Sequence, residues 1–292
     1  LALEVYRWSD GSFLECQDFW RLSGIEREVW LQARPEVHLA DVQVLAGLEN
    51  QYSDGVLSIA LDIAHLGKQP FGGTAKCILS SGGKEAAEAT LPLRVSPGDT
   101  ARFTWRQNLP SVRTWTAETP HLYELDIVLM DGNSNTAEAT RIEVGFRDIR
   151  IEDGLVKVNG KALLIKGTNR HEHHPETGHV IDRATMEADI QTLKAHNFNA
   201  VRTSHYPNHP YWYTLCDRYG LYVVDEANIE SHGMGYALDR TLGNNPDWMH
   251  AHMVRTERMV ARDRNHPSIL CWSLGNEAGN GVNFEATRAF VK

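Results

Sequence analysis

The strongest constraint on the fold is a repeat in the second half of the chain, where short apolar runs alternate with amphipathic stretches of helical period. Four runs have the length and composition of strands: residues 162–166, 200–202, 221–225 and 269–274. The third run is apolar on both faces, as strands of a parallel sheet are. The stretches between them have the spacing and end signals of helices. This pattern predicts four consecutive βα units.

Helices are predicted after each of these strands. The first is capped by Asp182 and carries Met186, Ile190 and Leu193 on one face. The second covers residues 209–219 and ends at Gly220. The others are expected at residues 247–264 and from near Asn283 onward.

Four units are half of what a closed barrel requires. A (β/α)₈ TIM barrel needs eight units in about 250 residues, and residues 148–292 are too few for that. We therefore expect an incomplete barrel, with its remaining strands outside this sequence. An open, doubly wound four-stranded sheet is the alternative. No Gly-rich phosphate-binding loop follows any of the strands, which disfavours it.

The first half of the chain has a different pattern. Residues 35–147 contain short alternating runs, such as 56–63 and 122–129, separated by Gly-containing turn signals. This predicts an antiparallel β-sandwich with an immunoglobulin-like topology, without the core cysteine pair of antibody domains. Strand-like pieces at 3–8 and 28–32 have no partners in residues 1–34. We expect them to be the trailing edge of a preceding domain.

Composition excludes several classes of function. The chain has 29 Lys and Arg against 38 Asp and Glu, a net charge of −9, and no long basic run. Nucleic acid and anionic membranes are therefore not expected partners. No apolar run reaches the roughly 18 residues needed to cross a bilayer.

The cysteine pattern does not indicate a zinc site or a disulfide framework. Cys16, Cys77, Cys216 and Cys271 form no CxxC pair. We predict free thiols in the core, which fits a cytoplasmic protein.

Polar residues cluster directly after each predicted strand, where the active site of a TIM barrel lies. The clusters are residues 169–175, 203–209, 225–233 and 275–279. The first contains His171, Glu172 and His174, but a zinc-protease HExxH motif would need a histidine where Pro175 stands, on a helix. We expect these histidines to line a sugar pocket, with some of them purely structural.

Glu277 is the strongest catalytic candidate. Glycoside cleavage needs a carboxylic acid that protonates the leaving oxygen and a carboxylate that then activates water. A glutamate at a partly dry barrel mouth can have its pKa raised to suit both roles. The amide of the adjacent Asn276 can hold a sugar hydroxyl. The sequence therefore predicts an acid/base at this position.

Glu230 is a second carboxylate at the end of the neighbouring strand. It can pair with Glu277 in catalysis, or the two can share a divalent cation with His232. An oxygen-rich set of this kind suits Mg²⁺ completed by waters. A buried hydrogen-bond network is the third possibility, and these residues alone leave the three open.

At these residues the sequence resembles the large bacterial β-galactosidases of glycoside hydrolase family 2. The resemblance is carried by residues 169–175, 199–210, 212–230, 264–269 and 272–277, and more weakly by 10–25. It implies the end of a sugar-binding jelly roll at 1–34, an immunoglobulin-like sandwich at 35–147 and the first half of a TIM barrel at 148–292. It also implies a cytoplasmic, homo-oligomeric parent enzyme acting on small β-galactosides.

The resemblance also implies individual roles. Glu277 matches the acid/base of the family, and Glu230, His232 and Glu277 match its Mg²⁺ ligands. His171, His205 and Asn276 match groups lining the galactose site. Asp18 matches a residue that contacts sugar and helps hold Na⁺.

In the family the nucleophile is a glutamate on a later strand, beyond residue 292, so Glu230 is not expected to be the nucleophile. The isolated chain is then expected to be inactive. A β-glucuronidase or β-mannosidase, and a non-catalytic carbohydrate-binding or scaffold fragment, are the competing hypotheses.

Overall fold

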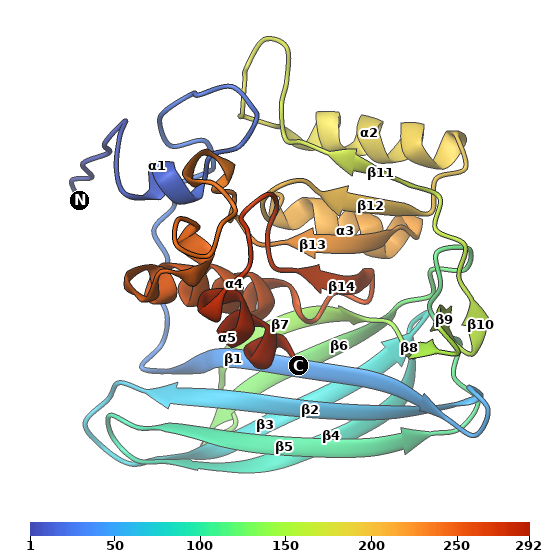
Figure 1. Ribbon diagram of the computed structural model, residues 1–292. Coiled ribbons are helices and arrows are strands. Elements are labelled where there is room, and N and C mark those ends of the chain that lie inside the picture. Colours follow the sequence, from blue (N-terminus) through green and yellow to red (C-terminus); the bar gives the residue numbers. More distant parts are fainter. The chain divides into compact units, whose positions relative to one another are not determined.

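The computed structural model describes residues 1–292, which form two compact units (Figure 1). The barrel unit comprises Leu1–Val29, Ile165–Asp263 and Ser268–Lys292. The sandwich unit comprises Trp30–Leu164 and Arg264–Pro267.

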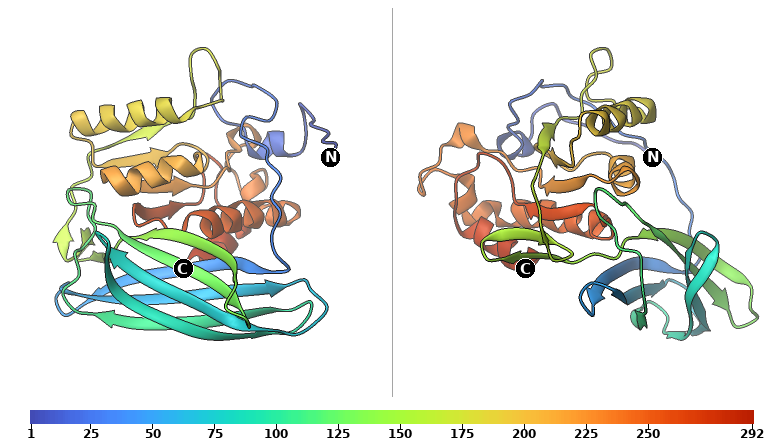
Figure 2. Two further views of the ribbon diagram at one scale, coloured as in Figure 1. Left: turned by 180° about the vertical axis from the view of Figure 1, so that it is seen from behind. Right: turned by 90° about the vertical axis from the view of Figure 1, so that its right-hand side faces the viewer.

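The sandwich unit contains two antiparallel sheets, whose long strands are blue to green in Figure 2. One sheet has the order β1 (Val37–Glu49), β2 (Asp54–His65), β5 (Thr100–Leu109). The other has the order β4 (Lys84–Val95), β3 (Phe71–Ser81), β6 (Tyr123–Asp131), β7 (Thr136–Val144). The predicted antiparallel sandwich is confirmed.

Strict alternation of side chains builds the core of this unit. Along β2, Leu57, Ile59, Leu61 and Ile63 are all buried while their neighbours are partly exposed. A period of two places one face of a strand against the core and leaves the other toward solvent. Short alternating runs therefore fold here as the sequence predicts.

A small antiparallel sheet follows, made of β8 (Ile149–Glu152), β9 (Leu155–Val158) and β10 (Lys161–Ala162). The parallel strand predicted at 162–166 is therefore wrong. A tight turn at Asn159 and Gly160, both with positive φ, folds β10 back onto β9. The chain leaves that hairpin before it joins the parallel sheet at residue 167.

The barrel unit is built on four parallel strands in the order β11 (Gly167–Arg170), β12 (Ala200–Thr203), β13 (Tyr222–Glu226), β14 (Ile269–Ser273). Its long helices are α2 (Arg183–Ala195), α3 (Pro210–Tyr219), α4 (Met249–Asp263) and α5 (Val282–Val291). Three 3₁₀ turns, His232–Met234, Leu242–Asn244 and Pro246–Trp248, lie in the connection before α4. The predicted four βα units, and with them the incomplete barrel, are confirmed.

Helix ends and helix packing follow the local sequence. The Asp182 carboxylate accepts from the Thr185 amide at 2.8 Å and caps α2, and Gly220 ends α3 in the left-handed conformation. Met186 and Ile190 of α2 are buried with residues of α3 and of β12 to β14. Figure 1 shows α2 beside β11, and α3 beside β12 and β13.

The N-terminal residues do not form the strands predicted at 3–8 and 28–32. Only the one-turn helix α1 (Gly11–Leu14) is present, and Trp8 and Trp30 are 67% and 71% exposed. A strand needs a neighbour for its backbone hydrogen bonds, and residues 1–34 supply none. The preceding jelly-roll domain stays a prediction.

All four cysteines are free thiols, as predicted. Cys77 and Cys216 are buried, but Cys16 is only partly buried and Cys271 is exposed. The core prediction is wrong for Cys271, because β14 lies at the edge of its sheet. None of the helices is both long and apolar enough to span a membrane.

Candidate active site

The predicted polar clusters meet at the carboxyl end of the parallel sheet. The Asn276 amide donates to the Ile229 carbonyl at 2.9 Å, which joins the segment after β14 to the one after β13. The N-terminal segment around Leu14 to Cys16 makes backbone hydrogen bonds with Glu230, in the segment after β13. The Glu230 amide donates to the Leu14 carbonyl at 2.6 Å, and the Cys16 amide donates to the Glu230 carbonyl at 2.8 Å. These backbone contacts bring Asp18, Glu230 and Glu277 to one site.

His232 lies at the centre of a carboxylate cluster. Its Nε2 is 3.4 Å from Asp18 Oδ1, and its Nδ1 is 3.4 Å from Glu230 Oε1 and 3.8 Å from Glu277 Oε2. Ligand atoms of Asp18, Glu230 and His232 all lie within 4.8 Å of one another. Asp18, expected to hold a separate Na⁺, is therefore part of the same cluster as two of the expected Mg²⁺ ligands.

The chemistry of this cluster fits a cation. Glu230 is 1% exposed, and its Oε2 and the Nδ1 of His232 are buried without a hydrogen-bond partner. Burial raises the pKa of Glu230, opposed by a hydrogen bond from Asn276. Desolvation and the field of the nearby carboxylates also raise the pKa of Tyr236. Carboxylate oxygens suit Mg²⁺, and unsatisfied buried ligand atoms are what a metal would complete.

Glu277 sits on an unusual backbone. Its φ of +39° is in the left-handed region, which a side-chain-bearing residue adopts only when its surroundings enforce it. Gly275 has φ +150°, and a Cβ there would lie 2.7 Å from the Ile229 carbonyl oxygen. The Glu277 side chain is 52% exposed. Strained backbone of this kind concentrates at functional sites.

The residues predicted to line the sugar pocket also lie together. The rings of His171 and His205 are 5.3 Å apart at 82°, and Phe19 stacks on His171 at 4.8 Å. Burial lowers the pKa of His171, and its Nδ1 has no hydrogen-bond partner. The Asn276 Oδ1 accepts from Arg202 Nη2 at 2.9 Å. The structure thus brings His171 and His205 together, and ties Asn276 to the same face of the sheet.

Three polar residues that contact His205, Asn276 or one another were missed by sequence reasoning. Glu226 is fully buried, and Arg202 makes a two-point ion pair with it at 2.8 and 3.0 Å. Ser273 Oγ donates to Glu226 Oε2 at 2.5 Å. A signal was present, because Arg202 and Glu226 are charges at the ends of otherwise apolar strands. Buried charges are usually paired.

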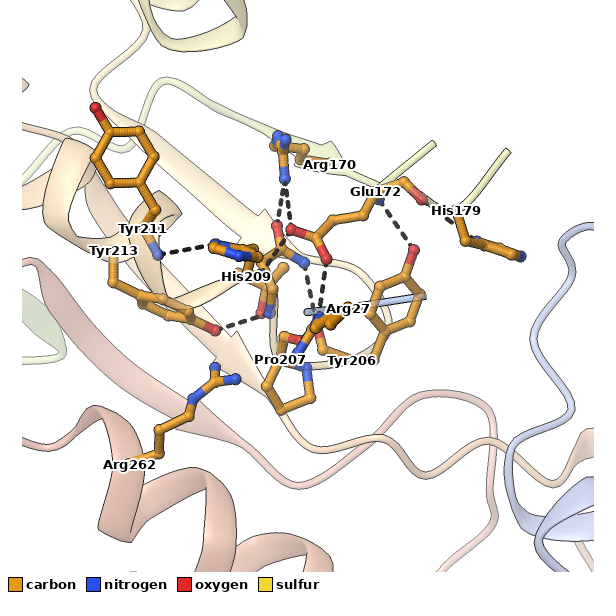
Figure 3. Close-up of polar contacts among 12 residues, drawn as sticks. Arg27, Arg170, Glu172, His179, Tyr206, Pro207, His209, Tyr211, Tyr213 and Arg262 are labelled. Carbon is orange, nitrogen blue, oxygen red and sulfur yellow. Dashed lines mark hydrogen bonds and ion pairs between the residues drawn. The ribbon is translucent and has the colours of Figure 1, made fainter. Parts of the chain in front are cut away.

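Glu172, in the His-rich loop, has a structural role (Figure 3). Its carboxylate accepts from Arg27 Nη2 at 2.9 Å and from the His209 amide at 2.6 Å, and lies 3.5 Å from Arg170 Nη1. These contacts fasten the loops after β11 and β12 to each other and to the N-terminal segment. In the same loop, the His174 Nδ1 accepts from the Glu176 amide at 3.2 Å.

A cavity of about 620 Å³ borders this network and is lined in part by Arg27, Glu172 and Arg258. Glu230, His232 and Glu277 are not among the residues that line it. The candidate site is therefore defined by its side-chain chemistry and backbone, not by cavity size.

Two sequence families match nearly the whole chain. "Glycosyl hydrolases family 2" matches residues 37–147, and "Glycosyl hydrolases family 2, TIM barrel domain" matches residues 149–292. The chain belongs to glycosyl hydrolase family 2. The resemblance stated from the motifs is thereby confirmed, with an immunoglobulin-like sheet domain followed by part of a TIM barrel.

Two curated β-galactosidases are similar to this chain. Those of Enterobacter cloacae and Vibrio vulnificus (strain YJ016) are each 48% identical over 298 residues. The match covers 100% of this chain and 28% of each relative's length. The chain thus spans little more than a quarter of these relatives.

Two solved structures share the fold of this chain. The apo structure of Bacteroides uniformis β-glucuronidase 3 matches with a TM-score of 0.77 and 28% identity, over 94% of this chain and 33% of that one. The Eisenbergiella tayi β-galacturonidase matches with a TM-score of 0.75 and 28% identity, over 88% of this chain and 43% of that one.

Proposed function

We propose that this chain is part of a retaining glycoside hydrolase that cleaves terminal β-D-galactosides by double displacement, with Glu277 as the acid/base. The observation that carries the proposal is the placement of Glu277, on a left-handed backbone beside Glu230 and His232 at the strand ends. The 48% identity to β-galactosidases over the whole chain supports the choice of sugar.

The geometry suits both tasks of an acid/base. A half-exposed Glu277 can protonate the glycosidic oxygen as the bond breaks, and then take a proton from the water that attacks the glycosyl-enzyme. His171, His205 and Asn276 offer directed donors and acceptors for sugar hydroxyls, and Asp18 lies at the rim with 78% of its side chain exposed.

The cation of the site is proposed to be Mg²⁺, held by Glu230, His232 and Glu277. When bound, it supplies positive charge that offsets the clustered carboxylates. A Na⁺ site that includes Asp18 is proposed beside it, completed by ligands outside this sequence. Support for the Mg²⁺ site comes from the unsatisfied ligand atoms of Glu230 and His232.

The nucleophile is proposed to be a glutamate on a later barrel strand, outside residues 1–292. Glu230 is a poor nucleophile, because it is 1% exposed and lies within ion-pair distance of His232. The isolated chain is then inactive, with residues 1–34, 35–147 and 148–292 as parts of three successive domains.

β-Glucuronidase is the second candidate, because solved structures of that name share the fold at 28% identity. A uronate needs a cationic partner for its carboxylate. Arg170 and Arg202 are cations at the strand ends, and both are already paired. Arg202 makes a two-point pair with Glu226. The Arg170 guanidinium lies 3.0 Å from the Asp189 carboxylate and 3.5 Å from that of Glu172. This arrangement favours a neutral sugar.

A chimera tests the proposal. Residues 1–292 replace the matching segment of the Enterobacter cloacae β-galactosidase, which supplies the rest of the barrel. The chimera is expected to hydrolyse an aryl β-D-galactoside in preference to the β-D-glucuronide, and the isolated chain to hydrolyse neither. Glu277→Gln is expected to slow an unactivated galactoside by about 10²-fold or more. Preference for the glucuronide, or galactose binding without turnover, would contradict the proposal.

A further inference from the structure

The Glu226 carboxylate lies beside His205, one of the residues proposed to contact sugar, and has no access to solvent. It is the last residue of β13 and stands opposite Ser273 of β14 in the parallel register. A buried carboxylate is costly unless each oxygen is paired. The hydrogen-bond partners of the Glu226 carboxylate therefore indicate which residues it holds in place.

Both oxygens of Glu226 are fully used. Oε1 lies 2.7 Å from His205 Nδ1 and accepts from Arg202 Nη2 at 3.0 Å. Oε2 accepts from Arg202 Nε at 2.8 Å and from Ser273 Oγ at 2.5 Å. The residue thus joins side chains carried by β12, by the loop after it and by β14.

These contacts reach two of the residues proposed to contact sugar. His205 is bound directly. Asn276 is bound through Arg202, whose Nη2 donates both to Glu226 and to the Asn276 Oδ1 at 2.9 Å. Asn276 adjoins Glu277, so displacement of Arg202 would be transmitted to the acid/base segment.

The contact with His205 also determines which ring nitrogen carries the proton. An ionised carboxylate only accepts hydrogen bonds, so the Nδ1 of His205 must donate. In the neutral ring Nε2 is then an acceptor, because the tautomer is set by the bond that the other nitrogen makes. With Nε2 as an acceptor, His205 can accept a hydrogen bond from a sugar hydroxyl.

We propose that Glu226 is a positioning residue that orients His205 and Asn276 and fixes the Nδ1–H tautomer of His205 for hydroxyl recognition. The inference rests on the proposed glycoside hydrolase function. Glu226 touches no substrate and acts through Arg202 and His205. Glutamine in its place offers only one acceptor oxygen, so it cannot satisfy Arg202, His205 and Ser273 together.

The test compares two adjacent buried carboxylates in the chimera, through Glu226→Gln and Asp225→Asn. Asp225 is equally buried, but its Oδ1 accepts from the Tyr213 hydroxyl of α3 at 2.5 Å and from the Thr203 hydroxyl at 3.2 Å, and not from His205 or Arg202. Glu226→Gln is expected to lower kcat/KM for the galactoside by about 10²-fold, the loss expected from a misplacement of about 1 Å. Asp225→Asn is expected to leave it within about threefold, and Glu226→Asp to recover part of the loss.

A second measurement uses the isolated chain and is independent of activity. Nitrogen-15 NMR of labelled histidine is expected to show His205 protonated at Nδ1 in the wild type and not held in that form in Glu226→Gln. Galactoside hydrolysis by Glu226→Gln within threefold of the wild-type chimera would overturn the inference. An unchanged His205 tautomer would also overturn it. A wild-type chimera with no galactosidase activity would instead contradict the proposed function. In that case the NMR measurement would still determine the tautomer of His205.

Discussion

Asp225 and Glu226 are consecutive residues of β13, and their buried carboxylates lie on opposite faces of the parallel sheet. Glu226 pairs with Arg202 on the pocket side at 2.8 Å, whereas the Asp225 Oδ1 accepts from the Tyr213 hydroxyl of α3 at 2.5 Å. The alternation of a strand makes this possible. One dipeptide therefore serves both the candidate site and the helical layer that supports it.

The raised pKa of Asp225 predicts how the free energy of unfolding depends on pH. Burial, and then the neighbouring Asp263 carboxylate, raise the pKa of Asp225 to about 8, against the influence of Tyr213 and Arg262. The folded chain therefore holds a proton that the unfolded chain releases near its ordinary pKa of 3.8. This contribution to the free energy of unfolding is fully present below that value. It is lost as the pH rises toward 8.

Urea unfolding at pH 5, 6.5 and 8 measures this effect in the wild type and in Asp225→Asn. The asparagine variant has no proton to lose, so its stability relative to wild type should improve steadily from pH 5 to pH 8. A stability difference that stays constant across this range would contradict the raised pKa of Asp225.

Gly275 is predicted to be irreplaceable. A Cβ there meets the Ile229 carbonyl oxygen at 2.7 Å, and the φ of +150° disfavours any other residue. Gly275→Ala should destabilise the chain by roughly 1–3 kcal/mol and weaken galactose binding through displacement of Asn276. Gly47→Ala is the control, because nothing lies within 4 Å of a Cβ at that position. Equal unfolding midpoints for the two variants would refute this account.

The carboxylate cluster predicts a cation-dependent stability. A ligand that binds only the folded chain raises its unfolding temperature. MgCl₂ should therefore raise the Tm of the isolated chain, compared with NaCl at equal ionic strength, and EDTA should reverse the rise. Glu230→Gln and His232→Ala should abolish the effect.

The matched control for these metal-site variants is Glu285→Gln, in which a carboxylate that is 64% exposed on α5 is changed. It should respond to MgCl₂ as the wild type does. Identical responses in wild type and Glu230→Gln would rule out Glu230 as a ligand. Asp18→Asn, tested with NaCl in place of MgCl₂, examines the Na⁺ site separately.

Much of the architecture could be predicted from local sequence. Side chains such as Leu57 and Ile59 alternate at a period of two, and the caps at Asp182 and Gly220 mark helix ends within a residue or two. The strand expected at 162–166 failed because apolar composition does not reveal that the Asn159–Gly160 turn pairs β10 with β9. Partner choice is a tertiary property.

The residues proposed to act directly in the candidate site could be predicted from the sequence. Glu277, Glu230 and His232 were found through their position after strands and through the family motifs. The residues that support them could not be predicted in this way. Glu226 and Arg202 stand at the ends of neighbouring strands, and only the three-dimensional structure shows that their side chains pair with each other. The joining of Asp18 to His232 depends on a backbone pairing between residues more than 200 positions apart in sequence.

The central claim is that Glu277 is the acid/base, and azide rescue tests it most directly. In the chimera with Glu277→Gly, an aryl galactoside with a good leaving group needs no acid for the first step, so the glycosyl-enzyme accumulates. Azide needs no base, so it should restore turnover and yield the β-galactosyl azide. Formation of the α-galactosyl azide would identify Glu277 as the nucleophile. If Glu277→Gly hydrolysed the substrate as fast as the wild-type chimera without azide, Glu277 would have no catalytic role.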